Sequence, residues 1–341
     1  MLPLVLAART AGHTVALATA APVDAAHGLE TWPVGGAAPG FRGGGTAAQR
    51  SAYFASSAAA RAADLIPRAD AWSPDLIISD TAEVAGPVAA AVTGARHVIH
   101  GLGAMPPMVV WHAYAVHLDT LLSRWGTGTS ADDIRDTLYL DVCPPALRRP
   151  GEPIWSRTLD LRPTPVPPPA GDAVLGRVAG MPYRDTVLAR PASFEDALAM
   201  LRGVRDLRIN LLLCADPADF GPQPPNVLIA RTALPSGCCA QVSTGGPGVL
   251  LPALGQGLPQ LILTQEQTAP DGTVTHGGAA LTINAATPSA VERAMHLHLP
   301  RLLADPAFAA AAAWSQVEIA AMSSPAAVVR TLTSQGVPAL R

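Results

Sequence analysis

Residues 241–265 restrict the fold of this chain most strongly, because two short apolar segments flank a glycine turn there. The first segment ends at the turn, a short helix follows, and a second turn from Gly257 leads into the apolar residues 261–263. Continuous apolar runs of this length are typical of strands that are buried on both faces. A strand, a helix and a second strand in this order predict one unit of a parallel α/β sheet.

The turn has the composition of an anion-binding loop. Gly245, Gly246 and Gly248 bring bare backbone amides to the start of the predicted helix, where partial positive charge collects. Together with Ser243 and Thr244 they form a candidate phosphate-binding turn. The alternative interpretation is a strand-to-helix turn that needs glycine only for its backbone angles.

Length and charge limit the number of domains and the kind of ligand. A chain of 341 residues fits two domains of roughly 150 residues each. The apolar share of 49% and the charged share of 14% indicate a folded protein. The net charge is −3, lysine is absent, and arginines form no basic run, so nucleic acid is not an expected partner.

The spacing of the cysteines and the hydropathy of the chain indicate the cellular compartment in which the protein is expected. Cys143, Cys214, Cys238 and Cys239 show no Cys-x-x-Cys spacing, which predicts neither a disulfide framework nor a zinc site and favours a reducing cytoplasm. Residues 1–8 are apolar but lack the basic leader of a signal peptide. Since no apolar run reaches the roughly 18 residues of a membrane span, we expect no membrane partner.

The chain begins with a predicted helix at residues 2–11, which is followed by a strand at residues 13–19. An α/β domain normally opens with a strand, because an opening helix needs a sheet to cover. The first strand is therefore expected to be missing. A homodimer, or a borrowed strand, is a hypothesis for covering the resulting sheet edge.

Polar residues follow two predicted strands, which end at Asp80 and His100. In open parallel sheets, ligands bind outside the carboxyl ends of the strands. We therefore expect Asp80, Glu83, His100 and Gly103 to face a ligand crevice. For Asp80, capping of the next helix is the alternative role.

Residues 105–125 combine sulfur-containing and aromatic side chains with histidines, a mixture that suits a flat hydrophobic ligand. Ordinary core packing is the alternative for each of these residues. The candidate acceptor-binding residues of this region are Met105, Met108, Trp111, His112 and Tyr114.

Residues 144–169 are dense in proline and predict a semi-rigid connector between two parts of the chain. We expect a first domain over 1–150, a linker over 151–170 and a second domain over 171–341. The second part again alternates strands and helices, which predicts a second parallel sheet. Its expected helices are 194–204, 288–299, 306–322 and 325–333, and its expected strands include 208–214, 226–231 and 261–263.

Seven collinear segments carry a resemblance to one family. They are residues 2–8 with Ala-Gly-His-Thr-Val at 11–15, Pro-Asp-Leu-Ile-Ile-Ser-Asp at 74–80, 86–91 with His-Gly-Leu-Gly at 100–103, 141–148, 225–227, 245–263, and 302–308 with 318–325. In this order they resemble the GT-B glycosyltransferases that attach sugars from nucleotide donors to antibiotics and other polyketide-type aglycones. The resemblance implies an α/β fold with two Rossmann-like domains, a hydrophobic natural-product ligand, and no metal or cofactor besides the nucleotide-sugar co-substrate.

The acceptor side departs from the family pattern. The family's first strand leads into a Gly-His turn, whose histidine acts as general base and is oriented by an aspartate. This sequence begins after that turn, so the resemblance leaves Asp80 as the orienting aspartate without its partner. A general base must lie within hydrogen-bond reach of the proton that it takes. His100 is the candidate substitute, with His97, His112 and His117 as further histidines that no motif supports.

The donor side departs as well. Where the family has His-Gly-Gly, this chain has Thr244 before two glycines, so a potentially charged contact becomes a neutral one that is weaker by about 1 kcal/mol or more. Pro247 and Val249 remove one backbone amide and one hydroxyl from the turn. Gln265 is kept. Thr232 replaces the family's aromatic residue beside the nucleobase, and Thr268 with Ala269 replaces its Asp-Gln pair. Segment 171–193 also differs from the family pattern.

We therefore predict a glycosyltransferase-like protein that binds a hydrophobic aglycone in a cleft between its domains and whose sugar transfer is lost or weakened. It would act as a helper or binding protein, or in a reaction such as a cyclisation guided by shape. The alternative is an active inverting transferase, in which the acceptor hydroxyl displaces the nucleoside diphosphate at the anomeric carbon.

Overall fold

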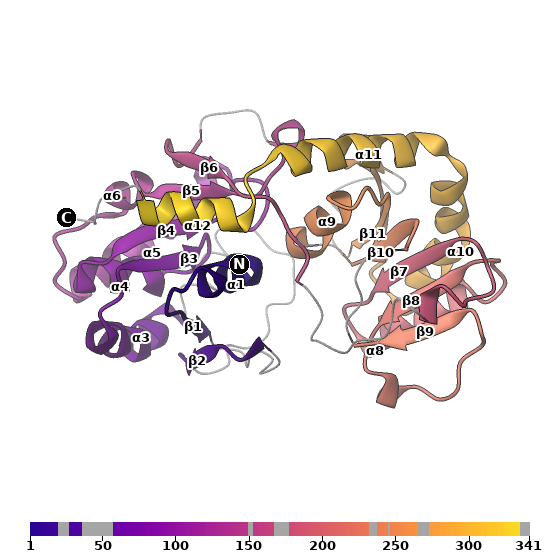
Figure 1. Ribbon diagram of the computed structural model, residues 1–341, viewed down its shortest axis with the longest axis horizontal. Coiled ribbons are helices and arrows are strands. Elements are labelled where there is room, and N and C mark those ends of the chain that lie inside the picture. The colour runs from indigo at the N-terminus through magenta and orange to yellow at the C-terminus, as the bar shows by residue number, and fades with distance from the viewer. Residues whose placement is uncertain are drawn as a thin grey trace. The chain divides into compact units, whose positions relative to one another are not determined.

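The computed structural model describes residues 1–19, 27–35, 57–148, 153–166, 177–231, 237–244, 246–264 and 273–334 (Figure 1). The chain divides into two compact units. Unit 1 comprises Met1–Cys143, Arg148–Arg162 and Met322–Arg341, and unit 2 comprises Pro144–Leu147 and Pro163–Ala321. The predicted domain limits stay a prediction. Across the described ranges, no helix has the length and apolar character needed to cross a membrane.

A four-stranded sheet forms the centre of unit 1. In spatial order its strands are β3 (Leu76–Asp80), β4 (Arg96–His100), β5 (Leu138–Asp141) and β6 (Thr158–Asp160). All three pairings are parallel, so the carboxyl ends of the four strands meet at one edge. A separate parallel pair is formed by β1 (Ala16–Thr19) and β2 (Glu30–Pro33).

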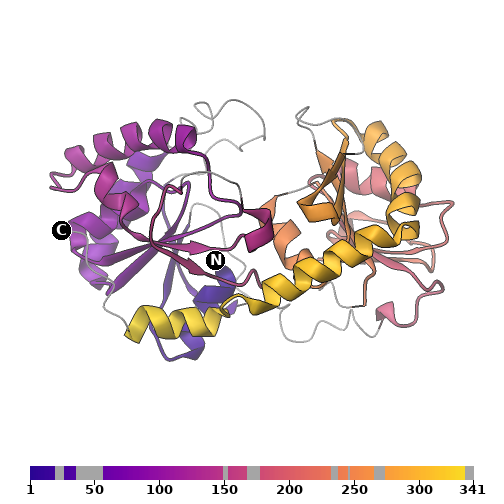
Figure 2. The same ribbon diagram turned by 90° about the horizontal axis from the view of Figure 1, so that it is seen from above.

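Helices surround the unit 1 sheet (Figure 2). They are α1 (Leu2–Thr10), α3 (Ala58–Trp72), α4 (Ala85–Thr93), α5 (Met108–Arg124), α6 (Ala131–Arg135) and α12 (Pro325–Ser334). Helix α4 packs against α3 and α5, and the last helix, α12, packs against the first, α1. Both ends of the described chain therefore belong to the same unit.

An aromatic group anchors the core of unit 1. Tyr139 of β5 stacks on Trp155 with ring centroids 4.8 Å apart, and Trp155 meets Trp111 of α5 edge-on at 5.5 Å. Leu118 and Leu122 of α5 join the same buried cluster. Because a buried aromatic ring removes a large apolar area from water, this group holds β5 and the loop after it against α5.

The sheet of unit 2 has seven strands. In spatial order they are β12 (Thr273–Thr275), β13 (Ala280–Asn284), β11 (Gln260–Thr264), β10 (Ala240–Ser243), β7 (Thr186–Arg190), β8 (Asn210–Cys214) and β9 (Val227–Ala230). Only β12 pairs antiparallel with its neighbour among the described strands. Numbered along the chain, the six parallel strands lie in the order 3-2-1-4-5-6, which is the doubly wound arrangement of dinucleotide-binding domains. The direction of winding reverses between β7 and β10.

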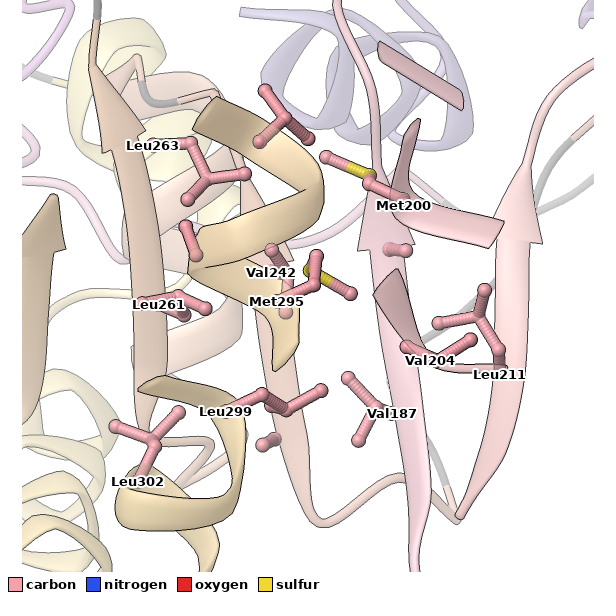
Figure 3. Close-up of a cluster of buried hydrophobic side chains, with 14 of the residues drawn as sticks. Val187, Met200, Val204, Leu211, Val242, Leu261, Leu263, Met295, Leu299 and Leu302 are labelled. Atoms are coloured by element: carbon pink, nitrogen blue, oxygen red, sulfur yellow. The ribbon is translucent and has the colours of Figure 1, made fainter. Parts of the chain in front are cut away.

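Both faces of the unit 2 sheet are covered. Val187 of β7 belongs to the larger apolar core, whereas the next residue, Leu188, points into a smaller cluster on the other face. Figure 3 shows the larger core, where Met200 and Met295 approach the strands. The helices of unit 2 are α8 (Phe194–Gly203), α9 (Pro247–Leu254), α10 (Pro288–Ala304) and α11 (Pro306–Ala321). This two-sided burial explains why the strand sequences are continuous apolar runs.

Most predicted elements of both units are confirmed within one to five residues at their ends, and the predicted α/β class holds. Helix α3 is described from Ala58 to Trp72, while residues 49–56, which precede it, lie outside the described residues. Residues 154–160, which were assigned to the proline-dense connector, instead contain strand β6 and the buried Ile154 and Trp155. Residues 167–170 of that connector lie outside the described residues.

The contact between α8 and α10 generates a test of packing. A Cβ atom at Gly203 would lie 2.5 Å from the Met295 Cβ and 2.6 Å from the Glu292 carbonyl oxygen. The Gly203→Ala substitution should therefore lower the free energy of unfolding by about 1–3 kcal/mol. Urea denaturation measures this loss. Gly221→Ala, where a Cβ meets nothing within 4 Å, is the control, and equal stability of the two variants would contradict the packing account.

Candidate functional site

Asp80 and His100 end neighbouring strands and are paired in register at the carboxyl edge of the unit 1 sheet. The Asp80 carboxylate accepts a hydrogen bond of 2.7 Å from the amide of Ala82, in the turn that precedes α4. Helix α4 begins only at Ala85, so Asp80 caps this turn and not the helix itself. Burial raises the pKa of Asp80, against the lowering effects of that hydrogen bond and of the positive charge of Arg61. A carboxylate with a raised pKa is a stronger base than an exposed one.

Glu83 lies in a polar cluster with Arg61 and Tyr114. The Arg61 Nε atom is 2.9 Å from Glu83 Oε2, and Glu83 Oε1 accepts a hydrogen bond of 2.7 Å from the amide of Ala85. The Tyr114 hydroxyl donates to the Glu83 backbone carbonyl over 2.7 Å. Burial raises the pKa of Glu83, and Arg61 opposes this shift. Arg61 compensates the negative charge of this cluster, a role that its place in an alanine-rich segment did not indicate.

Two histidines of β4 are held neutral by burial. Burial lowers the pKa of His97 to about 3. The pKa of His100 is lowered to about 4, and burial is the largest cause of that shift. The His97 Nε2 atom lies 2.9 Å from the Ser79 hydroxyl oxygen. The His100 Nδ1 atom is buried and has no hydrogen-bond partner in the described part of the chain. At neutral pH both imidazoles therefore carry a nitrogen lone pair that can accept a proton or a hydrogen bond.

The candidate acceptor residues are distributed around α5 and the loop before it. Trp111 and Tyr114 are buried in the core of unit 1, and Met105 and Met108 pack against that core while partly exposed. His112 is exposed, on another side of the helix. Gly103 is buried in the loop after β4. The structure thus brings Tyr114 to Glu83 and Asp80 to His100, and it separates His112 from both pairs.

The glycine turn of unit 2 follows the carboxyl end of β10. Ser243 is buried and Thr244 half-buried. Gly246, which precedes Pro247 at the start of α9, has a φ of +94°, and a Cβ at Gly246 or Gly248 would meet nothing within 4 Å. The glycine is thus needed for the backbone conformation, and space is open around the turn. Gly245 and Gln265 lie outside the described residues, as do Thr232, Thr268 and Ala269.

Arg190 is a candidate that the sequence pattern did not single out. It is the last residue of β7 and is paired in register with Ser243 of β10. These two strands flank the point where the sheet reverses its winding, which is where doubly wound domains bind their ligands. In the sequence, Arg190 lies within the segment 171–193, where only departures from the family pattern stand out. Among the described residues, no group of three or more His, Cys, Asp or Glu side chains could hold a metal ion.

The chain is similar to several known proteins. Residues 43–154 match a family described as "Erythromycin biosynthesis protein CIII-like, N-terminal domain". The "L-demethylnoviosyl transferase" of Streptomyces niveus is 31% identical over 77% of this chain and 75% of its own length. The "Elloramycin glycosyltransferase ElmGT" of Streptomyces olivaceus is 31% identical over 79% of this chain and 71% of its own length.

Solved structures support the fold. The "glycosyltransferase VinC in complex with DTDP" has a TM-score of 0.71 at 27% identity, covering 98% of this chain and 95% of its own. The "Spinosyn Rhamnosyltransferase SpnG" has a TM-score of 0.76 at 23% identity with the same coverage. The predicted two-part α/β fold of GT-B type is confirmed by these likenesses.

The buried histidines generate a pH-dependent prediction. The unfolded chain protonates His97 below about pH 6.5, whereas the folded protein keeps it neutral down to about pH 3. The folded state then binds fewer protons, so stability falls as the pH drops below 6.5. Between pH 7 and pH 5, wild-type protein should lose about 2 kcal/mol more unfolding free energy than the His97→Gln variant.

Urea denaturation at the two pH values measures this difference. Glutamine can still form a hydrogen bond with Ser79 but does not titrate, and His112→Gln, at an exposed position, is the control. An equal loss in wild-type and His97→Gln protein would show that His97 is not held neutral by burial.

Proposed function

This chain belongs to the glycosyltransferases of antibiotic biosynthesis, and we propose that it transfers a sugar from a nucleoside diphosphate to a hydrophobic natural-product acceptor. The observation that carries the proposal is the reversal of the unit 2 sheet between β7 and β10, with the glycine turn and Arg190 at the strand ends. The relatives named above are transferases, which supports the same reaction type for this chain.

On the donor side, the diphosphate is proposed to bind at Ser243, Thr244, Gly246 and Gly248, with Gly245 and Gln265 as predicted further contacts. Thr244 offers a hydroxyl where the resemblance implies a histidine, so it supplies no charge. The guanidinium of Arg190 is the compensating cation, because arginine pairs with phosphate oxygens in a planar, bidentate way. We propose that the donor is held by this arginine and the backbone amides of the turn.

On the acceptor side, Asp80 is proposed to take the proton of the acceptor hydroxyl as its oxygen attacks the anomeric carbon. The bond from that carbon to the diphosphate breaks, and the nucleoside diphosphate leaves with the electron pair. The raised pKa of Asp80 suits it to accept a proton. His100, neutral and paired in register with Asp80, is proposed to orient the hydroxyl through its imidazole. Glu83, Gly103 and the predicted residues of 105–114 stay proposed acceptor contacts.

A second candidate function is favoured by the composition of the glycine turn. Pro247 at the first position of α9 lacks an amide hydrogen, and Val249 has no hydroxyl, so the cradle offers fewer donors to an anion. A protein that binds the natural product without using a sugar donor, as a helper or in a cyclisation, would tolerate these replacements. The two candidates differ in whether a nucleoside diphosphate binds.

Calorimetric titration with thymidine and uridine diphosphates separates the two candidates. We expect wild-type binding, and we expect Arg190→Gln to raise the dissociation constant about tenfold, since it removes one charge-assisted contact. Arg205→Gln, which changes an exposed arginine after α8, should leave the affinity unchanged. No binding of either nucleotide by the wild-type protein would contradict sugar transfer and favour the second candidate.

Replacement of Asp80 tests the catalytic proposal. Asp80→Asn keeps the shape of the side chain and removes the base, so kcat for transfer should fall by about 10²–10⁴-fold. Product formation followed by mass spectrometry measures the rate. Asp75→Asn, an exposed position just before the same strand, should retain the wild-type rate, and full activity of Asp80→Asn would rule Asp80 out as base.

A further inference from the structure

Two glutamines lie beneath helix α9, on the face of the unit 2 sheet opposite its main core. Val242 and Leu261 point into that core (Figure 3). Gln241 and Gln260 each precede one of them on β10 and β11, so their side chains point to the other face. The two glutamines are paired in register on neighbouring parallel strands, and each is only 1% exposed. Two side-chain amides are therefore buried side by side under α9.

Both amides donate hydrogen bonds to the backbone of α9. Gln260 Nε2 donates to the Leu250 carbonyl over 2.9 Å. Gln241 Nε2 donates to the Val249 carbonyl over 3.3 Å and to Gln260 Oε1 over 3.4 Å. Because a carbonyl oxygen has two lone pairs, these bonds can add to those within the helix. The glutamine pair thus ties the first turn of α9 to the sheet.

Helix α9 depends on such external support. It has eight residues and contains Pro252, which offers no amide hydrogen to the carbonyl of Gly248 four positions earlier. Apolar packing beneath its first turn is small, because Leu250 shares its buried cluster with Ile262 and Ala280 alone among the described residues. A helix this short with an internal proline is unstable in isolation. Contacts with the sheet therefore set its position.

Stability of the fold alone does not account for the glutamine pair. The Oε1 atom of Gln241 is buried and has no hydrogen-bond partner in the described part of the chain. A buried polar atom without a partner costs free energy, and apolar side chains of the same size can replace a buried polar pair at little or no cost. Hydrogen bonds, by contrast, fix a direction that apolar contacts leave free. The pair is suited to orienting the helix.

We propose that Gln241 and Gln260 are positioning residues for diphosphate binding, which act through the backbone of α9 and do not touch the ligand. The inference rests on the proposed function, in which the amides of Gly246 and Gly248 contact the diphosphate. Gly246, with its φ of +94°, leads directly into α9, so a rotation of the helix would move both amides together. By holding the carbonyls of the first turn, the glutamine pair keeps these amides directed at the strand ends.

Gln241→Met tests the assignment, because methionine has nearly the shape of glutamine and donates no hydrogen bond. The dissociation constant of thymidine diphosphate, measured by calorimetry, should rise about tenfold, and Gln260→Met should have a similar effect. The urea midpoint of Gln241→Met should equal or exceed that of wild type, because an unpaired buried oxygen is removed. Gln256→Met, at an exposed position just after α9, is the matched control and should change neither quantity.

A second measurement follows the position of α9 without any ligand. In hydrogen–deuterium exchange of the ligand-free protein, peptides over residues 246–255 should exchange faster in Gln241→Met than in wild type. Peptides over β7 and β8 should exchange at the wild-type rate. Faster exchange confined to α9 is the signature of a helix that has lost its orientation in an intact sheet.

The outcomes separate this inference from the proposed function. Wild-type affinity in both methionine variants would overturn the positioning role and leave the proposed function intact. A lower urea midpoint with faster exchange over the whole sheet would show that the pair serves only the fold, and would also overturn the positioning role. Absence of thymidine diphosphate binding by the wild-type protein would overturn the proposed function. The exchange of α9 then decides alone: faster exchange in Gln241→Met supports the orienting role of the pair, and unchanged exchange overturns it.

Discussion

The parallel pairing of β7 with β10 is the constraint on which unit 2 depends. Strands that run in one direction bring all their carboxyl ends to one edge, and burial on both faces leaves that edge as the place for polar groups. Val187 and Leu188 point to opposite apolar clusters, so neither face of β7 can hold a charge at low cost. Arg190, one step beyond this apolar run, reaches the strand end beside Ser243. The proposed donor site follows from this arrangement.

Unit 1 uses the same arrangement with different chemistry. Asp80 and His100 end neighbouring strands, and Asp141 and Asp160 end the next two, again paired in register. Arg148 bridges the second pair, because its Nε lies 3.0 Å from Asp141 Oδ2 and its Nη2 lies 2.5 Å from Asp160 Oδ1. The contacts of Asp141 and Asp160 with Arg148 hold the loop between β5 and β6, so these two carboxylates have a structural role. The Asp80 carboxylate accepts a hydrogen bond from the Ala82 amide and forms no direct ion pair with any described residue, which is why the proposed reaction is placed there.

The parallel strands and the glycine turn could be predicted from the sequence, because short apolar runs between turns are typical of strands that are buried on both faces. The sequence did not predict β5 and β6, since four or three residues carry too little periodicity and the prolines around Trp155 suggested a connector. The burial of Trp111 and Tyr114 in the core of unit 1 could not be predicted, because composition alone does not say which side of a helix faces the sheet. Their role as acceptor contacts stays a prediction. Phe194 and Phe220 are 26 positions apart in numbering, and only the fold brings their rings together.

The central claim is that a nucleotide binds across the carboxyl edge of the unit 2 sheet. Hydrogen–deuterium exchange of the full chain, with and without thymidine diphosphate, tests it most directly, because bound phosphates and bases slow the exchange of the amides that they cover. The account predicts slower exchange in the peptides that contain Arg190 and the turn at 243–248. Unchanged exchange in both, or protection confined to unit 1, would contradict it.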